Sequence, residues 1–342
     1  MQLGIIGLER CGKTTLFEAL TQSETDVARK GEVRIGTINV PDERVDILSK
    51  MYNPRKTIYA QIQYVLPGAR DAQAKSTDAI WNPVRTCDAL IHVVRNFQDQ
   101  GGEDPNPSKD FSRLDQELVF ADLVVVEKRL ERMELDSKRG KKVDTEEQDL
   151  LKACLELLEQ EKPIRTNPEL AAAPKLRGFT FVSAKPTLIV FNNDESDDAM
   201  PQVSGLGESE ICMVVRGKLE AELGLMDPEE AQVFLEEYGV KTTARDRMIR
   251  KSYELLGQIS FFTVGEDEVR AWTITRATQA VDAADVIHSD IKRGFIRAET
   301  LGYQDLIDTG SYVEAKKAAK VRLEGKTYIV ADGDIINFRF NV

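Results

Sequence analysis

The sequence predicts an α/β fold with a mostly parallel sheet, and three observations lead to this prediction. First, the chain opens on an apolar run, a glycine-containing turn and a helical segment over residues 3–20, which is the order of a strand, a loop and a helix. Second, short apolar runs recur along the chain. Third, helical stretches separate several of these runs, as expected of parallel strands buried on both faces. The predicted strands are Leu3–Ile6, Ile62–Leu66, Ala89–Val94, Phe179–Val182 and Leu188–Phe191.

Residues 111–162 break this alternation with a charged pattern in which leucine and valine recur at helical spacing. The pattern is interrupted at Ser137–Asp144, which is polar and contains a glycine. Two long helices joined by such a turn form an antiparallel helical hairpin, here inserted into the sheet domain. We expect its apolar stripe to be core rather than a partner-binding face.

The pattern changes again towards the C-terminus. Asn192–Gly207 is rich in turn-forming residues and is predicted to be a loop, and Val233–Arg250 is predicted to be helical. Beyond Gly257, short strands predict a small, separately folded β-rich domain. These strands are Phe261–Thr263, Glu268–Ile274, Lys326–Val330 and Ile335–Phe340. We therefore expect a sheet domain (residues 1–110 and 175–256), an inserted hairpin (111–174) and a C-terminal domain (257–342).

Composition argues against several classes of protein. The apolar runs are far shorter than the roughly 18 residues of a membrane span, and the N-terminus lacks the basic start of a signal peptide. We therefore expect no membrane partner and a cytoplasmic location. The four cysteines are scattered and there are only two histidines, which argues against disulfides and structural zinc.

The net charge of −12 argues against indiscriminate nucleic-acid binding, because the phosphate backbone favours an excess of lysine and arginine. A contact with RNA must then come from a local basic patch. One candidate is Lys138–Lys142, although a short charged run is more often just a solvated loop.

The segment Gly7–Thr14 has a sequence pattern that is typical of phosphate-binding loops. A glycine, four residues, and then Gly12, Lys13 and Thr14 follow the first predicted strand and open the first helix. Glycines let backbone N–H groups curl around phosphate oxygens, and the helix directs its positive dipole end at the same anion. Lys13 would bridge the outer phosphates, and the Thr14 hydroxyl would ligate Mg²⁺. The motif predicts a nucleotide-binding P-loop, and we count the adjacent Thr15 among its residues.

The middle of this loop holds Glu9, Arg10 and Cys11. Only the backbone of these positions is required to hold phosphate, so we expect Glu9 and Arg10 to point to solvent. Cys11 is either a redox-active thiol at a helix N-terminus or a small buried filler, and we favour the filler.

Strings along nearly the whole chain carry a resemblance to a known family: Gly7–Leu20, Asp88–Arg95, Glu268–Thr273, His288–Asp290, Gly294–Glu299, Asp332–Asp334 and Phe338–Val342. Together they resemble the YchF/Obg-like ATPases, a translation-factor class of P-loop proteins. The resemblance implies a G-domain-like P-loop NTPase fold with a helical-hairpin insertion and a small C-terminal α+β TGS domain, which is ubiquitin-like. It also implies that the TGS domain contacts RNA or the ribosome.

The resemblance extends to the residues that read the base. In ordinary GTPases an Asn-Lys-x-Asp motif after a strand reads guanine, and the corresponding stretch here is Asn192-Asn193-Asp194-Glu195. It looks like the family's Asn-x-x-Glu variant, which implies that ATP is preferred to GTP, that Asn192 contacts the base, and that Asn193 and Glu195 belong to the site. The alternative is a merely acidic loop, because Asn and Asp are common turn formers.

The metal side departs from the family. Members carry an Asp-x-Ala-Gly motif whose Asp belongs to the Mg²⁺ shell, whereas Leu66 stands at that position here. A missing carboxylate weakens metal retention and the positioning of the attacking water. The following switch segment, Arg70–Trp81, is short. In the first switch region the family's threonine has no clear counterpart, and Thr25 and Thr37 are the two candidates.

No catalytic residue can be named from the sequence. His92 lies in an apolar strand and is predicted to be core, and His288 lies in the C-terminal domain. Two functions therefore stay open. The chain is either a slow ATPase, accepting ATP or GTP with Mg²⁺, or a degenerate P-loop protein that holds nucleotide without turnover and docks on ribosomes or RNA.

Overall fold

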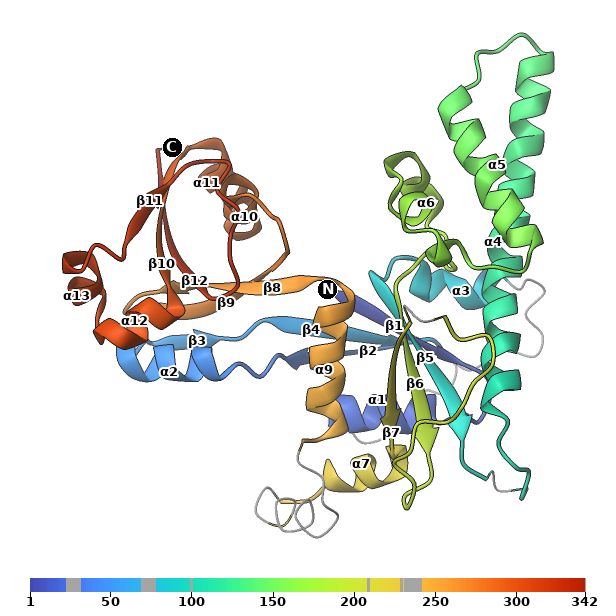
Figure 1. Ribbon diagram of the computed structural model, residues 1–342, viewed down its shortest axis with the longest axis horizontal. Coiled ribbons are helices and arrows are strands. Elements are labelled where there is room, and N and C mark those ends of the chain that lie inside the picture. The colour runs from blue at the N-terminus through green and yellow to red at the C-terminus, as the bar shows by residue number, and fades with distance from the viewer. Residues whose placement is uncertain are drawn as a thin grey trace. The chain divides into compact units, whose positions relative to one another are not determined.

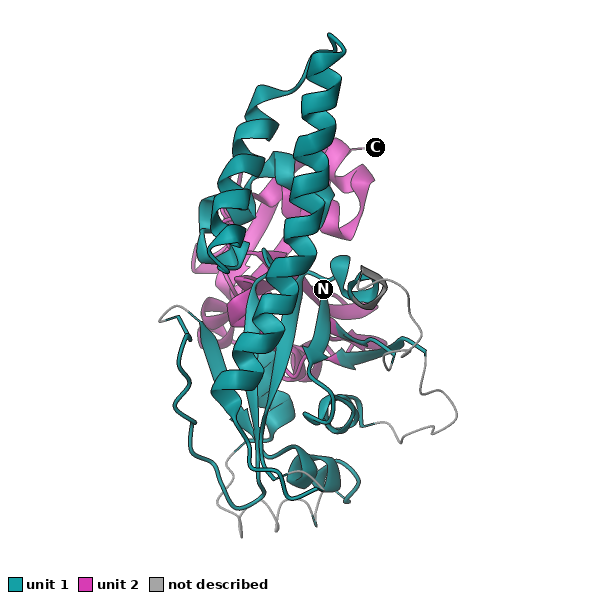
Figure 2. Cartoon of the chain, turned by 90° about the vertical axis from the view of Figure 1, so that its right-hand side faces the viewer, with its two compact units in different colours: residues 1–38, 63–251 teal, residues 39–62, 252–342 magenta. Residues whose placement is uncertain are grey.

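The computed structural model describes residues 1–22, 32–68, 78–98, 101–207, 210–227, 230 and 242–341. The chain forms two compact units, one of residues 1–38 with 63–251 and the other of residues 39–62 with 252–342 (Figure 2). The division expected from the sequence assigned residues 39–62 to the sheet domain. In the structure these residues instead pack with the C-terminal part of the chain.

The first unit is built on a six-stranded sheet (Figure 1). Its strand order is β2 (Arg34–Asn39), β4 (Gln61–Leu66), β1 (Gln2–Gly7), β5 (Ala89–Asn96), β6 (Thr187–Asn193) and β7 (Ile211–Val215). Strand β1 pairs in parallel with β4 and β5, and β6 pairs in parallel with β5 and β7. Every residue of β6 is buried, as expected of a central strand covered on both faces. The predicted, mostly parallel sheet is confirmed.

Helices accompany this sheet. They are α1 (Lys13–Thr21), α3 (Asp78–Arg85), α7 (Gly217–Leu223) and α9 (Ala244–Leu255). Helix α1 packs against α7 and β1. Helix α9 confirms the C-terminal part of the helix predicted at Val233–Arg250, of which residues 233–241 lie outside the described part of the chain. Among the described helices, none combines the length and the apolar character that crossing a bilayer requires.

The predicted hairpin is formed by α4 (Pro107–Lys138) and α5 (Thr145–Glu159), which lie side by side (Figures 1 and 2). Helix α4 begins four residues before the predicted start, because the Asn106 side chain caps the Lys109 N–H and Pro107 occupies the first turn. Asp144 caps α5 in the same way by accepting from the Glu147 N–H. The polar residues between the helices are therefore a turn that ends in a cap.

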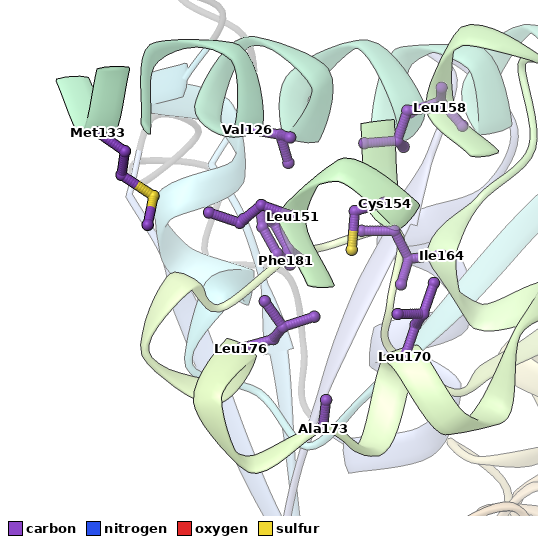
Figure 3. Packing of buried hydrophobic residues seen from close by; sticks show 11 residues of the cluster. Val126, Met133, Leu151, Cys154, Leu158, Ile164, Leu170, Ala173, Leu176 and Phe181 are labelled. Atoms are coloured by element: carbon purple, nitrogen blue, oxygen red, sulfur yellow. The ribbon is translucent and has the colours of Figure 1, made fainter. Parts of the chain in front are cut away.

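The apolar stripe of the hairpin faces inward, as predicted. Side chains from α4 and α5 converge on those of η2 (Ile164–Thr166), α6 (Pro168–Ala172) and η3 (Pro174–Phe179), which follow the hairpin (Figure 3). At about 25 cal/mol per Å² of buried apolar surface, such a cluster stabilises the two helices against each other. It contains Val119, Val126, Met133, Leu151, Cys154, Leu158, Ile164, Leu170, Ala173, Leu176 and Phe181.

The strand predicted at Phe179–Val182 is wrong. Phe179 ends η3, the three residues after it form no strand, and Phe181 packs in the hairpin core. The N–H groups of Val182 and Ser183 donate to the buried carboxylate of Asp122 on α4, at 3.1 and 2.7 Å. A side chain thus replaces the neighbouring strand as the hydrogen-bond partner, which the apolar run did not reveal.

The second unit contains another six-stranded sheet. Its order is β11 (Arg322–Glu324), β10 (Phe295–Gly302), β12 (Asp334–Phe340), β8 (Gln258–Val264), β9 (Glu268–Thr275) and β3 (Lys56–Ile58). Its helices are α2 (Glu43–Tyr52), α10 (Ala280–Ile287), α11 (Ser289–Arg293), α12 (Tyr303–Thr309) and α13 (Tyr312–Lys317). This small α+β unit agrees with the predicted C-terminal architecture, although the strand predicted at Lys326–Val330 is wrong, because only Ile329 forms an isolated bridge there.

The Asp332-Gly333-Asp334 string has a structural role in this unit. Asp332 accepts a hydrogen bond from the Ser260 N–H at 2.9 Å. Asp334 is buried and accepts from the Ala331 N–H and the Tyr328 hydroxyl at 2.9 and 2.8 Å. These contacts fix the turn that enters β12.

Candidate nucleotide-binding site

The loop between β1 and α1 requires glycine at both ends. Gly12 has a φ of 93°, a left-handed conformation, and a Cβ there would collide with the side-chain amide of Asn192. A Cβ at Gly7 would lie 2.5 Å from the Cys11 sulfur and 2.6 Å from the Val93 carbonyl oxygen. The backbone at Gly7 and Gly12 therefore packs so closely against neighbouring atoms that only glycine fits, as in the P-loop motif.

Lys13 lies across the loop. Its Nζ donates to the carbonyl oxygens of Gly7 and Leu8 at 2.9 and 2.6 Å. Thr14 is exposed in the first turn of α1, Thr15 is half-buried, and Gly12 at the N-cap has no side chain to occupy the first N–H groups of the helix. An ammonium, a hydroxyl and unoccupied helix N–H groups together suit a polyphosphate.

The middle of the loop follows the expected division between solvent and core. Glu9 and Arg10 are exposed, and Arg10 has a left-handed φ of 61°. Cys11 is buried, and burial raises the pKa of its thiol above the ordinary value. Because the thiolate is the reactive form, this environment favours the buried filler over the redox-active thiol.

Asn192 connects the P-loop to the start of α7 through its side-chain amide. It lies at the end of β6, where it pairs with Val215, so the loop predicted to begin at this residue begins two residues later. Its Nδ2 donates to the Cys11 carbonyl at 3.1 Å, and its Oδ1 accepts from the Gly217 N–H at 2.9 Å. The buried amide thus braces the phosphate loop against the start of α7. Its predicted contact with the base stays a prediction.

The remaining side chains of this stretch are also engaged. Asn193 is buried, accepts from Asn96 at 2.9 Å and donates to the Ala199 carbonyl at 2.8 Å. Asp194 accepts from the N–H and the hydroxyl of Ser196. Glu195 is half exposed, and one of its carboxylate oxygens lies 2.5 Å from Lys218 Nζ.

Sequence reasoning missed Arg216, Gly217 and Lys218, which the structure brings against Asn192–Glu195. Arg216 donates to the Glu195 carbonyl at 3.4 Å. A Cβ at Gly217 would lie 2.7 Å from the Asn192 Oδ1. The available signal was an arginine, a glycine and a lysine directly after the apolar run Ile211–Val215, but that run was not recognised as a strand.

The metal side of the site is apolar where a carboxylate was expected. Leu66 ends β4 and is buried. Over the described residues, no group of three or more His, Cys, Asp and Glu side chains could hold a metal ion. Thr37 lies exposed on β2. Thr25 and residues 70–77 of the second switch segment lie outside the described residues.

His92 lies in the core, as predicted. It is buried in β5 and stacks on Phe111 of α4 with ring centroids 5.4 Å apart. Burial, followed by the charges of Arg165 and Lys13, lowers its pKa to about 3. At neutral pH the ring is therefore uncharged.

This burial predicts a pH-dependent stability. Below pH 6.5 the unfolded chain takes up a proton at His92, whereas the folded chain does not. The free energy of unfolding is therefore highest above pH 6.5 and decreases as the pH falls towards 3. Between pH 7.5 and pH 5 the loss is about 2 kcal/mol. Urea unfolding at both pH values, followed by the fluorescence of buried Trp81, should show this loss in the wild type and not in His92→Gln. Equal losses would contradict the assignment.

Known proteins resemble the chain over its full length. Residues 258–341 match the YchF-GTPase_C family, described as a protein of unknown function (DUF933). The "Ribosome-binding ATPase YchF" of Bacillus subtilis is 38% identical over 362 aligned residues, which cover 99% of each chain. The protein of the same name from Escherichia coli O157:H7 is 34% identical, again over 99% of each chain.

Solved structures agree with the fold. The structure of the Schizosaccharomyces pombe YchF GTPase matches with a TM-score of 0.83 at 28% identity, covering 99% of this chain and 97% of that one. A GTP binding protein from Pyrococcus horikoshii, 17% identical with a TM-score of 0.58, shows a likeness of fold alone over the full length of both chains. The chain therefore has the P-loop GTPase fold.

Proposed function

Because the chain belongs to the YchF family, we propose that it binds ATP at Gly7–Thr14, hydrolyses it slowly and acts in association with the ribosome. GTP is the competing nucleotide. The curated relatives are named ribosome-binding ATPases, and a structural relative is named a GTPase. A cytoplasmic location is part of this proposal, since ribosomes are the proposed partner.

The observation that carries the proposal is the position of Lys13. Its ammonium lies 2.9 and 2.6 Å from two loop carbonyl oxygens, next to the start of α1, where no side chain caps the backbone N–H groups. A phosphate held by these N–H groups would lie beside the ammonium, which could then exchange a carbonyl oxygen for a phosphate oxygen. The bracing of the loop by Asn192 keeps this arrangement in place without nucleotide contacts.

Mg²⁺ fits the site through Thr14, whose exposed side chain is the one protein ligand that we propose. The metal would neutralise the charge that develops on the phosphates during transfer. The Leu66 side chain supplies no oxygen for an outer shell, so water or another carboxylate would have to complete it. This is the physical reason for proposing slow rather than efficient hydrolysis.

The buried Leu66 also favours a second function, a P-loop protein that holds nucleotide without hydrolysing it. Equilibrium titration with ATP and GTP, followed by single-turnover hydrolysis with and without Mg²⁺, separates the two. ATP binding with slow Mg²⁺-dependent cleavage supports the ATPase, and binding with no cleavage supports the non-hydrolysing module. Failure to bind either nucleotide contradicts both.

For the ribosomal partner we propose the tip of the hairpin. Two of its cations are neutralised, since Lys138 pairs with Glu134 at 2.6 Å and Lys141 with Asp136 at 2.7 Å. Arg139 and Lys142 form no ion pair with the described part of the chain and are exposed. The basic patch predicted from the sequence is thus reduced to two available cations.

If these cations contact ribosomal RNA, replacing both by alanine should flatten the dependence of log affinity on log salt concentration by about 2. Ribosome pelleting across a salt series measures this slope. The matched control replaces Lys128 and Lys152, which are exposed on the sides of the hairpin, and should leave the slope unchanged. Wild-type binding that does not weaken with salt would exclude the tip as an RNA contact.

A further inference from the structure

The stretch that would face the purine carries two acidic side chains, Asp194 and Glu195, and both already contact other protein groups. In Asn192–Glu195 all four side chains contact other protein groups. The Asn192 side chain forms hydrogen bonds with Cys11 and Gly217. The Asn193 side chain forms them with Asn96 and Ala199, and the Asp194 side chain with Ser196. The carboxylate of Glu195 pairs with the ammonium of Lys218.

The chain holds Glu195 at two points. Lys218 Nζ lies 2.5 Å from its Oε1, and this hydrogen bond raises the pKa of the lysine. Arg216 donates to the Glu195 backbone carbonyl at 3.4 Å. Gly217 between them bonds to Asn192. Arg216, Gly217 and Lys218 therefore hold both the backbone and a carboxylate of the stretch that is predicted to read the base.

Guanine and adenine differ in the hydrogen-bond donors and acceptors that they present to a carboxylate such as that of Glu195. Guanine presents two adjacent donors, N1–H and N2–H, beside the O6 acceptor, and a free carboxylate can accept from both donors. Adenine presents one donor, the N6 amine, beside the N1 acceptor, which a carboxylate oxygen repels. A carboxylate already paired with an ammonium gains little from guanine's donors.

We propose that the Glu195–Lys218 ion pair is a selectivity device that withholds the carboxylate from guanine, with Lys218 acting as a positioning residue. Selectivity then arises from removing an attraction to the competing base as well as from contacts to adenine. This inference rests on the proposed nucleotide binding at Gly7–Thr14 and assigns a role to a lysine that sequence reasoning did not identify.

Lys218→Met removes the charge, keeps an unbranched side chain and lies at an exposed position, so folding should be preserved. Because the released carboxylate can accept from guanine's two donors while the site stays exposed to solvent, the ratio of GTP to ATP affinity should rise by up to about fivefold. Equilibrium titration of the full chain with Mg²⁺ and each nucleotide measures both affinities. Lys218→Arg, which keeps the cation, should restore the wild-type ratio.

The matched control repeats the change in a Glu195→Gln chain. There is no carboxylate to release in that background, so Lys218→Met should leave the ratio unchanged. An unchanged ratio in the single variant, or an equal shift in both backgrounds, would overturn the role of the ion pair while leaving nucleotide binding intact. A wild-type chain that binds neither ATP nor GTP would instead refute the proposed function on which this role depends.

Discussion

Replacing Lys13 by alanine is expected to weaken ATP binding by roughly 10- to 100-fold, because hydrogen bonds to charged groups contribute about 1.5 to 3 kcal/mol. The ammonium now bonds to the Gly7 and Leu8 carbonyl oxygens and is half exposed, so water can replace it there. The variant should therefore stay folded while it loses the main cation of the phosphate site. Isothermal titration with ATP and Mg²⁺ measures the loss.

A matched control for this variant is Lys152→Ala. Lys152 is exposed on α5 in the hairpin, away from the P-loop. Its removal lowers the net charge of the protein by the same amount, so a general electrostatic effect on ATP would appear in both variants. Equal losses, or an unaltered affinity in Lys13→Ala, would show that nucleotide binds elsewhere or not at all.

Asn192→Ala is expected to lower the free energy of unfolding by about 2 to 4 kcal/mol and to weaken ATP binding as well. The substitution leaves the Cys11 carbonyl and the Gly217 N–H without their partner in a buried place, and an unsatisfied buried group costs about 1 to 3 kcal/mol. It also removes the brace of the phosphate loop. The two effects share one cause.

Urea unfolding can follow this loss through Trp81, which is buried in the first unit and is one of only two tryptophans. A Trp272→Phe background makes the signal specific to Trp81. The control is Lys152→Ala, which changes an exposed residue of α5 in the same unit and should cost less than about 0.5 kcal/mol. A comparable cost for both variants would mean that the Asn192 amide does not brace the loop.

The sequence predicted those parts of the site that depend on local order along the chain. The P-loop needs glycines, a lysine and a threonine at fixed spacing between a strand and a helix, and each requirement is visible within eight residues, Gly7–Thr14. The hairpin was equally visible, because its leucines recur at helical period over two long segments. Caps at Asn106 and Asp144 then set the helix starts.

Apolar runs were a less reliable guide where a side chain replaced a strand as hydrogen-bond partner. Phe179–Val182 has the composition of a buried strand, but the carboxylate of Asp122, some sixty residues earlier in the chain, accepts from the N–H groups of Val182 and of Ser183, which follows it. A pattern within four residues carries no information about a partner so distant. The same holds for residues 39–62, whose membership in the second unit depends on contacts with the C-terminal part of the chain.

The sequence by itself determined that this chain has a P-loop, an α/β sheet and a helical hairpin, because local spacing specifies each of them. Only the tertiary structure decided what surrounds that loop. Parallel pairing of β5, β6 and β7 brings Asn192 to Cys11 and Gly217, and Glu195 to Lys218. These residues lie far apart in sequence and meet because the carboxyl ends of parallel strands share one edge of the sheet.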